Sequence, residues 1–216
     1  MPTNQTAARH ARSAQLRHVV LWRLLELLTR DGDRSQRELS RELRTALGHT
    51  NQLLQGVVTA GWVRTVQGEG HRLRYELTRD GQAQRRRLAR LHLQQCGDAY
   101  AELREHMTTR LGQLIGHLGS APEATRLVFC GEPDLAEVGY LCARGLGATV
   151  VGTVDVDERP APSRWDVPCH GPDALDRERL AGEPFDCVVI MSFDRVERFR
   201  TSLRERRVPQ ARIATL

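Results

Sequence analysis

Four consecutive polar residues could read the edges of DNA bases. His49, Thr50, Asn51 and Gln52 stand at the start of a short segment whose following residues are mainly apolar. Asn and Gln side chains can pair bidentately with adenine, and a Thr side chain can contact the methyl group of thymine. A helix that is polar at its leading end and apolar behind can enter the major groove while its rear packs on a core. We therefore predict that these four residues contact bases.

The elements around this segment predict a winged helix-turn-helix over residues 15–81. A capping box, Ser35-Gln36-Arg37-Glu38, marks the start of the helix that precedes the base-reading helix. Two apolar runs separated by a Gly-Glu-Gly turn are typical of a hairpin of two strands, here carrying arginines. The elements expected are a disordered arm at residues 1–14, helices at residues 14–29 and from Ser35, and strands at residues 62–67 and 72–77.

Charge favours a nucleic-acid partner for this part of the chain. Residues 1–120 hold 19 arginines and 11 acidic residues, a net charge of +8, whereas residues 121–216 hold 13 and 16, a net of −3; together these give the formal charge of +5. A basic first half joined to a mildly acidic second half indicates a nucleic-acid-binding module attached to a second module of another kind. A winged helix used for protein contacts is the alternative. The further residues predicted to contact DNA are Ser35, Arg37, Arg41, Arg44, Arg72 and Arg74.

A long segment without proline, residues 82–120, predicts one extended helix. Its apolar residues recur at steps of three and four, the pattern of a helix that pairs with another helix. We interpret this seam as a dimer interface, and a helix that packs on its own second domain is the alternative. The residues predicted to form the seam are Leu93, Tyr100, Leu103, Met107, Leu111 and Leu114.

Residues 121–216 alternate strand and helix patterns, which predicts a parallel α/β sheet. In such sheets a ligand cleft lies at the carboxyl ends of the strands. Strands are expected at residues 126–130, 148–156 and 186–191, a helix at residues 133–145, a short helix at residues 172–180 and an amphipathic helix at residues 195–207. The residues expected to bind an effector in the cleft are Gly131, Glu132, Asp155 and Ser192.

Two family resemblances extend these predictions. The capping box, Leu47-Gly48-His49-Thr50-Asn51-Gln52, Gly61-Trp62-Val63 and Leu77-Thr78-Arg79-Asp80-Gly81 resemble the MarR-type winged-helix regulators associated with exopolysaccharide gene clusters. The resemblance covers residues 15–118 and implies a DNA-binding bacterial homodimer on a pseudo-palindromic operator with half-sites about one DNA turn apart.

Residues 126–216 resemble the Rossmann-like amino-terminal domain of sugar acyltransferases that bind nucleotide-sugars. Val128-Phe129-Cys130-Gly131, Val151-Gly152-Thr153-Val154-Asp155 and Asp186-Cys187-Val188-Val189-Ile190 carry this resemblance. It implies a nucleotide-like ligand. The chain departs from a glycine-rich phosphate loop, because Pro133 stands at the second glycine position and Glu132 would repel a pyrophosphate.

The remaining residues predict neither an enzyme nor a metal site. No acid–base or nucleophile pair is evident, and the five cysteines are scattered without a CxxC pair. Cys130 and Cys187 fall in apolar strands and are interpreted as small core residues. The most apolar early run, residues 19–28, contains Arg23 and Glu26, so we expect no membrane span and a cytoplasmic protein with reduced thiols.

The sequence thus predicts a DNA-binding transcriptional regulator that acts as a repressor. Its partners are double-stranded DNA, a second copy and a nucleotide-like or other small effector, with no cofactor identified. Three alternatives remain: a redox repressor of the Rex kind that senses NAD(H), an enzyme related to nucleotide-sugars, and a scaffold whose winged helix binds proteins.

Overall fold

The computed structural model describes residues 3–67, 73–155 and 165–215, with the side chains of the first helix from Arg17 onward. The chain divides into two compact units, Met1–Asp98 and Ala99–Leu216. The boundary falls inside the 40-residue helix α4, Arg79–Leu118. The first half of α4 therefore belongs to one unit and its second half to the other, whereas the sequence predicted a separate helix between two domains.

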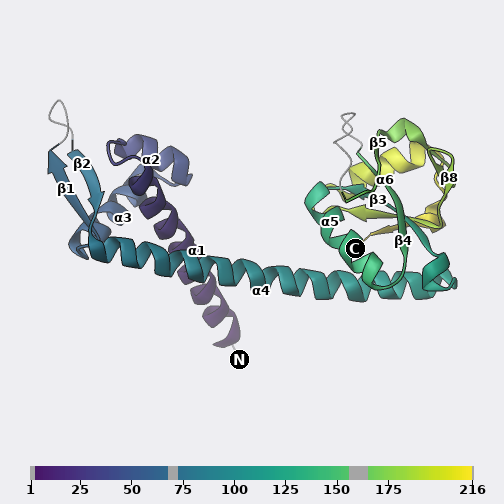
Figure 1. Ribbon diagram of the computed structural model, residues 1–216, viewed down its shortest axis with the longest axis horizontal. Helices are drawn as coiled ribbons and strands as arrows, with labels where there is room; N and C mark the ends of the chain where they lie inside the picture. The colour runs from purple at the N-terminus through teal and green to yellow at the C-terminus, as the bar shows by residue number, and fades with distance from the viewer. Residues whose placement is uncertain (1–2, 68–72, 156–164, 216) are drawn as a thin grey trace. The chain divides into compact units, whose positions relative to one another are not determined.

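The first unit is a helix-turn-helix followed by a two-stranded antiparallel ribbon, an arrangement called a winged helix (Figure 1). Its elements are α1 (Thr3–Arg30), α2 (Gln36–Leu43), α3 (Leu47–Thr59), β1 (Val63–Gln67) and β2 (Leu73–Leu77). Leucines of α1 and α2 pack with Leu54 and Val57 of α3, Val63 of β1, Tyr75 of β2 and Leu88 of α4. This core fixes α3 against the base of the ribbon. The turn of the ribbon, residues 68–72, lies outside the described residues.

The amino-terminal segment differs from its predicted state. The sequence predicted a disordered arm at residues 1–14, but α1 already begins at Thr3. Residues 3–30 contain neither glycine nor proline, so nothing in them interrupts a helix. A polar composition is compatible with an exposed helix as well as with a disordered arm.

Hydrogen bonds anchor the ribbon in the middle of β2 and just after its end. The Tyr75 amide donates to the Gly32 carbonyl (2.9 Å), and the Thr78 hydroxyl donates to the Gly61 carbonyl (2.7 Å). A side chain at Gly32 would collide with the carbonyl oxygen of Tyr75, so only glycine permits this approach. The ribbon therefore has a fixed position relative to α1 and α3.

The second unit is a five-stranded, all-parallel sheet in the order β10-β9-β3-β4-β5. The chain runs outward from the central β3 to β4 and β5, and then returns to place β9 and β10 on the other side. The order therefore reverses between β3 and β9, where open α/β sheets form ligand crevices. The strands are β3 (Arg126–Gly131), β4 (Thr149–Val154), β5 (Cys169–His170), β9 (Cys187–Met191) and β10 (Ile213–Thr215).

Two hydrophobic cores cover the two faces of this sheet. On one face, α5 (Pro133–Gly145) and the second half of α4 pack against Leu127, Phe129 and Val189. On the other face, α6 (Val196–Glu205) packs against Val128 and Ile190 together with a small antiparallel sheet. That small sheet consists of β6 (Leu175–Asp176), β7 (Arg179–Leu180) and β8 (Glu183–Pro184). One-turn 3-10 helices lie at Pro122–Ala124, Pro172–Ala174 and Gln210–Arg212.

The short helix predicted at residues 172–180 is wrong. Only Pro172–Ala174 forms a helical turn, and the chain then enters β6 and β7. Arg177 and Ala181 have φ angles of 43° and 49°, so the two turns of the small sheet use left-handed backbone at residues other than glycine. No helix among the described residues is long and apolar enough to cross a membrane.

Candidate nucleic-acid interface

The capping box predicted at Ser35 is present and positions α2. The Ser35 hydroxyl accepts from the Glu38 amide (3.3 Å), and the Glu38 carboxylate accepts from the Ser35 amide (2.7 Å) and hydroxyl (2.8 Å). The hydrogen bond from the Ser35 backbone holds the pKa of Glu38 below its usual value. Because the hydroxyl is used within the protein, we assign Ser35 to helix capping instead of the predicted DNA contact.

The exposed face of α3 carries His49, Gln52 and Gln55, whereas Leu54 and Val57 are buried. These three residues follow each other at steps of three, so they occupy one side of the helix. His49 and Gln52 were predicted to contact bases, and Gln55 was not. The sequence could have indicated Gln55, because it follows Gln52 by three residues and therefore shares its side of the helix. The amide groups of Gln52 and Gln55 are the ones best suited to pair with adenine.

The predicted contact between Thr50 and a base is wrong, because Thr50 is completely buried. Its hydroxyl lies 2.8 Å from the Thr45 hydroxyl and donates to the Ala46 carbonyl at 3.3 Å. Thr50 precedes Leu54 by four residues and Val57 by seven, which places it on the inner stripe of α3. Thr50 therefore links α3 to the turn that precedes it.

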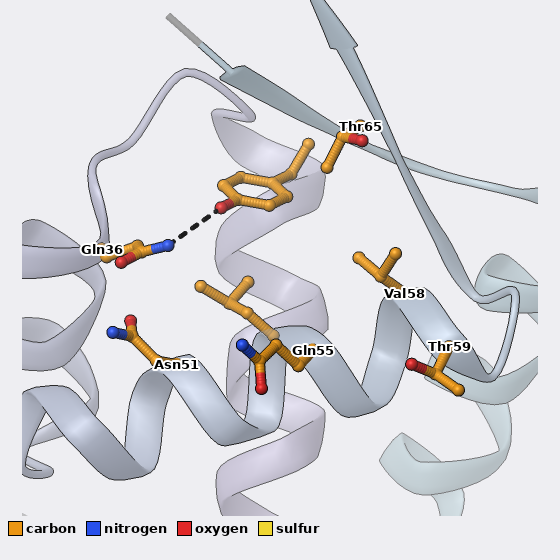
Figure 2. A pocket seen from close by; sticks show the side chains of 8 residues that line it. Gln36, Asn51, Gln55, Val58, Thr59 and Thr65 are labelled. Carbon is orange, nitrogen blue, oxygen red and sulfur yellow. Dashed lines mark hydrogen bonds between the residues drawn. The ribbon is translucent and has the colours of Figure 1, made fainter.

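Asn51 is half-buried, in contrast to the exposed His49 and Gln52. Its side chain points from α3 toward Gln36 of α2 (Figure 2). The amide oxygen of Asn51 is buried and has no hydrogen-bond partner in the structure. With its oxygen closed off from solvent, Asn51 as placed cannot form the predicted bidentate pair with adenine.

The arginines around this face fall into two groups. The side chains of Arg37, Arg41 and Arg44 are exposed on α2 and its end. Arg74 of β2 is held by Asp33 (3.6 Å) and Glu76 (3.7 Å). The remaining predicted wing contact, Arg72, lies outside the described residues. Ion pairs between exposed groups are weak, about 0–1 kcal/mol, so a phosphate can compete for Arg74.

Arg64 of β1 is a further candidate that sequence reasoning missed. Its guanidinium donates to Glu76 through Nε (3.1 Å) and through a terminal nitrogen (2.8 Å), and its side chain is 68% exposed. Arg64 is opposite Glu76 in the ribbon. The pair therefore presents one guanidinium at the surface of the strand next to α3.

The predicted dimer seam on α4 divides into residues that are covered and residues that are not. Met107 and Leu111 are buried in the core of the second unit, and Leu103 and Leu114 pack against that core. Leu93 and Tyr100 are 69% and 43% exposed. The prediction of one continuous intermolecular seam is therefore corrected, because α5 and the sheet already cover its second half.

The four residues predicted to bind an effector lie at one edge of the parallel sheet. Gly131 ends β3, Asp155 follows β4 and Ser192 follows β9. The Ser192 hydroxyl donates to the Glu132 carboxylate (2.9 Å) and accepts from the Arg195 amide (3.1 Å). Glu132 thus occupies the start of α5 with its own carboxylate, at the place where a phosphate of a bound nucleotide would sit.

Two cysteines of the parallel sheet, Cys130 and Cys187, have thiols that resist ionisation. Burial, and to a lesser extent the Asp155 carboxylate, raises the pKa of Cys130 to about 12. Burial raises the pKa of Cys187 to about 11. Both side chains lie in the sheet, as the sequence predicted. Neither is poised to react at neutral pH.

No protein-family model and no curated protein matches this chain. Among solved structures, the Mycobacterium tuberculosis MarR family protein Rv2887, in complex with p-aminosalicylic acid, is 21% identical over 56% of this chain and 100% of that chain, with a TM-score of 0.37. The M. tuberculosis transcriptional regulator MosR is 19% identical over 54% and 97%, with a TM-score of 0.35. PigF with SAH is 13% identical over 88% and 68%, with a TM-score of 0.27. TM-scores this low establish neither a shared fold nor a family for this chain.

Proposed function

We propose that this chain is a DNA-binding transcriptional regulator. The observation that carries the proposal is the exposed face of α3, where His49, Gln52 and Gln55 stand in one row with an apolar stripe behind them. A helix of this kind, fixed in a helix-turn-helix, can insert into a major groove and present its amide groups to base edges. The exposed arginines of α2 lie on the preceding helix and are suited to the flanking phosphates.

The active form in this proposal is a homodimer that represses transcription at a pseudo-palindromic operator. Leu93 and Tyr100, two turns apart on α4, are exposed apolar residues that a second copy would cover in this dimer. A dimer places two α3 helices on the same side of DNA, which doubles the number of base contacts.

The second unit, with the reversing strand order of a Rossmann-like sheet, senses a small effector in this proposal and catalyses no reaction. The Glu132 carboxylate at the start of α5 disfavours a pyrophosphate, since two anions would share one site. This argues against a dinucleotide such as NAD(H) and favours an effector without phosphate. We place the protein in the cytoplasm, where its DNA target is found.

The test is binding of the purified full-length protein to genomic DNA fragments. The double variant Gln52→Ala, Gln55→Ala removes the two proposed base contacts. Gln113 is also an exposed glutamine within a helix. Gln113→Ala is therefore the matched control for the effect of a Gln-to-Ala change on helix propensity. Selective binding that the double variant loses and the control keeps supports the proposal. Absence of any selected fragment, or equal binding by all three proteins, contradicts it.

A further inference from the structure

A cysteine and a histidine lie side by side on α4. The thiol sulfur of Cys96 is 3.8 Å from Nε2 and 3.9 Å from Nδ1 of His92, which stands one helical turn earlier. The Cys96 side chain is exposed. The indole ring of Trp22 on α1 packs against the His92 imidazole, with 4.6 Å between the ring centroids. This contact restrains the imidazole, while the thiol beside it stays accessible from solvent.

The pair has the chemistry and the spacing of two zinc ligands. Thiolate and imidazole are the ligands of structural zinc sites, with Zn–S about 2.3 Å and Zn–N about 2.0–2.1 Å, so two of them at a tetrahedral angle lie about 3.6 Å apart. The separation of Cys96 and His92 is close to this value. Within the described part of one copy, no group of three or more metal-ligating side chains gathers. One chain therefore offers two of the four ligands that zinc takes.

A second copy of the chain can supply the other two ligands. Leu93, Cys96 and Tyr100 follow one another at steps of three and four, so they share one side of α4. Cys96 stands between the two exposed apolar residues. In a two-fold symmetric dimer, a residue on the axis meets its own copy. An antiparallel crossing centred on Cys96 therefore places Leu93 against the partner's Tyr100 and brings the two cysteine–histidine pairs together.

Such a site is electrically neutral. Two thiolates balance the charge of Zn²⁺, and the two imidazoles bind it uncharged, while the two thiol protons pass to solvent. Burying an ion is very costly unless its charge is compensated. A neutral cluster can therefore be enclosed between Leu93 and Tyr100 of the two copies.

We propose that two copies of this chain share one zinc ion, held by His92 and Cys96 of each copy where their α4 helices cross. The inference rests on the homodimer of the proposed function and adds the metal that joins its two copies. Because the complete site exists only in the dimer, zinc stabilises the dimer by mass action. By linkage it also raises the affinity for an operator with two half-sites. The sequence predicted no metal site, since each chain carries only half of the ligand set.

The test is zinc titration of the full-length protein, stripped of metal and kept reduced, in competition with a chromophoric chelator. Saturation is expected at one zinc for two chains, with zinc strengthening the dimer in analytical ultracentrifugation. Cys96→Ser and His92→Gln should each bind zinc about tenfold more weakly or worse, since each removes two of the four ligands. With cobalt as the probe, thiolate-to-metal charge transfer should be present in the wild type and absent from Cys96→Ser.

Two matched controls change the same residue types elsewhere. Cys169→Ser alters a half-buried cysteine of the second unit, and His106→Gln alters an exposed histidine of α4. Both should bind zinc as the wild type does. Saturation at one zinc per chain, absence of zinc binding, or unchanged binding in both ligand variants would overturn the proposal.

DNA binding is measured separately. Zinc should raise the affinity of the wild type for a selected fragment severalfold and have no such effect on Cys96→Ser. If the protein binds one zinc per dimer but selects no DNA, the proposed function fails while the metal site stands. If it selects DNA but binds no zinc, the metal site fails while the proposed function stands.

Discussion

At the scale of single residues, neighbours on α3 have opposite roles. Thr50 is completely buried and hydrogen-bonded, whereas Gln52 is exposed. In a helix of about 3.6 residues per turn, two side chains that are two positions apart point to nearly opposite sides. The role of each polar residue is therefore set by the side of the helix on which it stands.

We expect Thr50→Val to lower the free energy of unfolding by roughly 1 kcal/mol, because the Thr45 hydroxyl loses its partner. DNA affinity of the folded protein should stay within twofold of the wild type. Denaturant unfolding and DNA binding at one salt concentration measure the two effects. A large loss of affinity without a loss of stability would return Thr50 to the DNA interface.

The thiols give a prediction on pH and reactivity. The pKa values of Cys130 and Cys187 are raised from 9.0 to about 12 and 11, so the folded state holds these protons more tightly than the unfolded state does. The stabilisation is fully present below about pH 9 and is lost as pH rises toward 11 and 12. The free energy of unfolding should therefore fall above pH 9, and a Cys130→Ala, Cys187→Ala variant should show a flatter decline.

Alkylation at pH 8 provides an independent check on the same cysteines. Cys96 is exposed and should react first. Cys130 and Cys187 should react only after denaturant is added, since buried thiols are both protonated and inaccessible. Mass spectrometry of digested protein identifies the modified positions. Modification of Cys130 in the native protein would contradict its burial.

At the scale of elements, α4 contributes to two cores at once. Leu88 packs in the first unit, and Met107, Leu111 and Ile115 pack in the second. Between them, Leu93 and Tyr100 remain exposed. A regular apolar stripe on a helix indicates that one face is covered, but it does not say whether the cover is another chain or another part of the same chain.

Leu111→Ala should lower the free energy of unfolding by about 2–5 kcal/mol, because it opens a cavity in a closed core. Leu93→Ala removes the same atoms from an exposed position and should cost less than about 0.5 kcal/mol in the monomer. Thermal unfolding at low protein concentration compares the two. A small effect of Leu111→Ala would contradict the packing of α4 on the sheet.

The capping box gives a second prediction at this scale. Ser35→Ala removes the side-chain hydrogen bond to the start of α2 and should cost about 1 kcal/mol. Ser35→Asp retains an acceptor at this position and should recover most of the loss. Chemical unfolding of the three proteins under one set of conditions measures both differences.

Elements with strong local signals could be predicted from the sequence, and elements without them could not. The helix at residues 133–145 was predicted with the bounds that α5 has, because proline begins it and glycine ends it. The small sheet at residues 175–184 was missed, since its first turn uses left-handed backbone at Arg177, where no glycine marks a turn. The partial burial of Asn51 was missed because residue type alone gives no information on which face of a helix is covered.

At the scale of the whole molecule, charge is divided along the chain. The net charge of +8 over residues 1–120 attracts DNA, and the net of −3 over residues 121–216 does not. The affinity for DNA should therefore depend steeply on salt and reside in the first unit. Each phosphate contact contributes about −0.9 to the slope of log affinity against log salt concentration.

Single variants in the full-length protein should separate phosphate contacts from base contacts. Arg41→Ala should weaken binding to all sequences alike and reduce the magnitude of the salt slope by about 1. Gln52→Ala should keep the slope and reduce discrimination at one base position, with a loss of roughly 1–3 kcal/mol on the selected site. Titrations of a selected and a scrambled fragment at several salt concentrations distinguish these patterns. Equal behaviour of the two variants would contradict this division of roles.

The most direct test of the central claim is selection of genomic DNA fragments by the wild type, by Gln52→Ala, Gln55→Ala and by Gln113→Ala. If the exposed face of α3 reads DNA, the wild type and the control enrich the same fragments, and the double variant enriches none. Enrichment of the same fragments by all three proteins, or by none of them, would contradict the assignment of α3 as the base-reading helix.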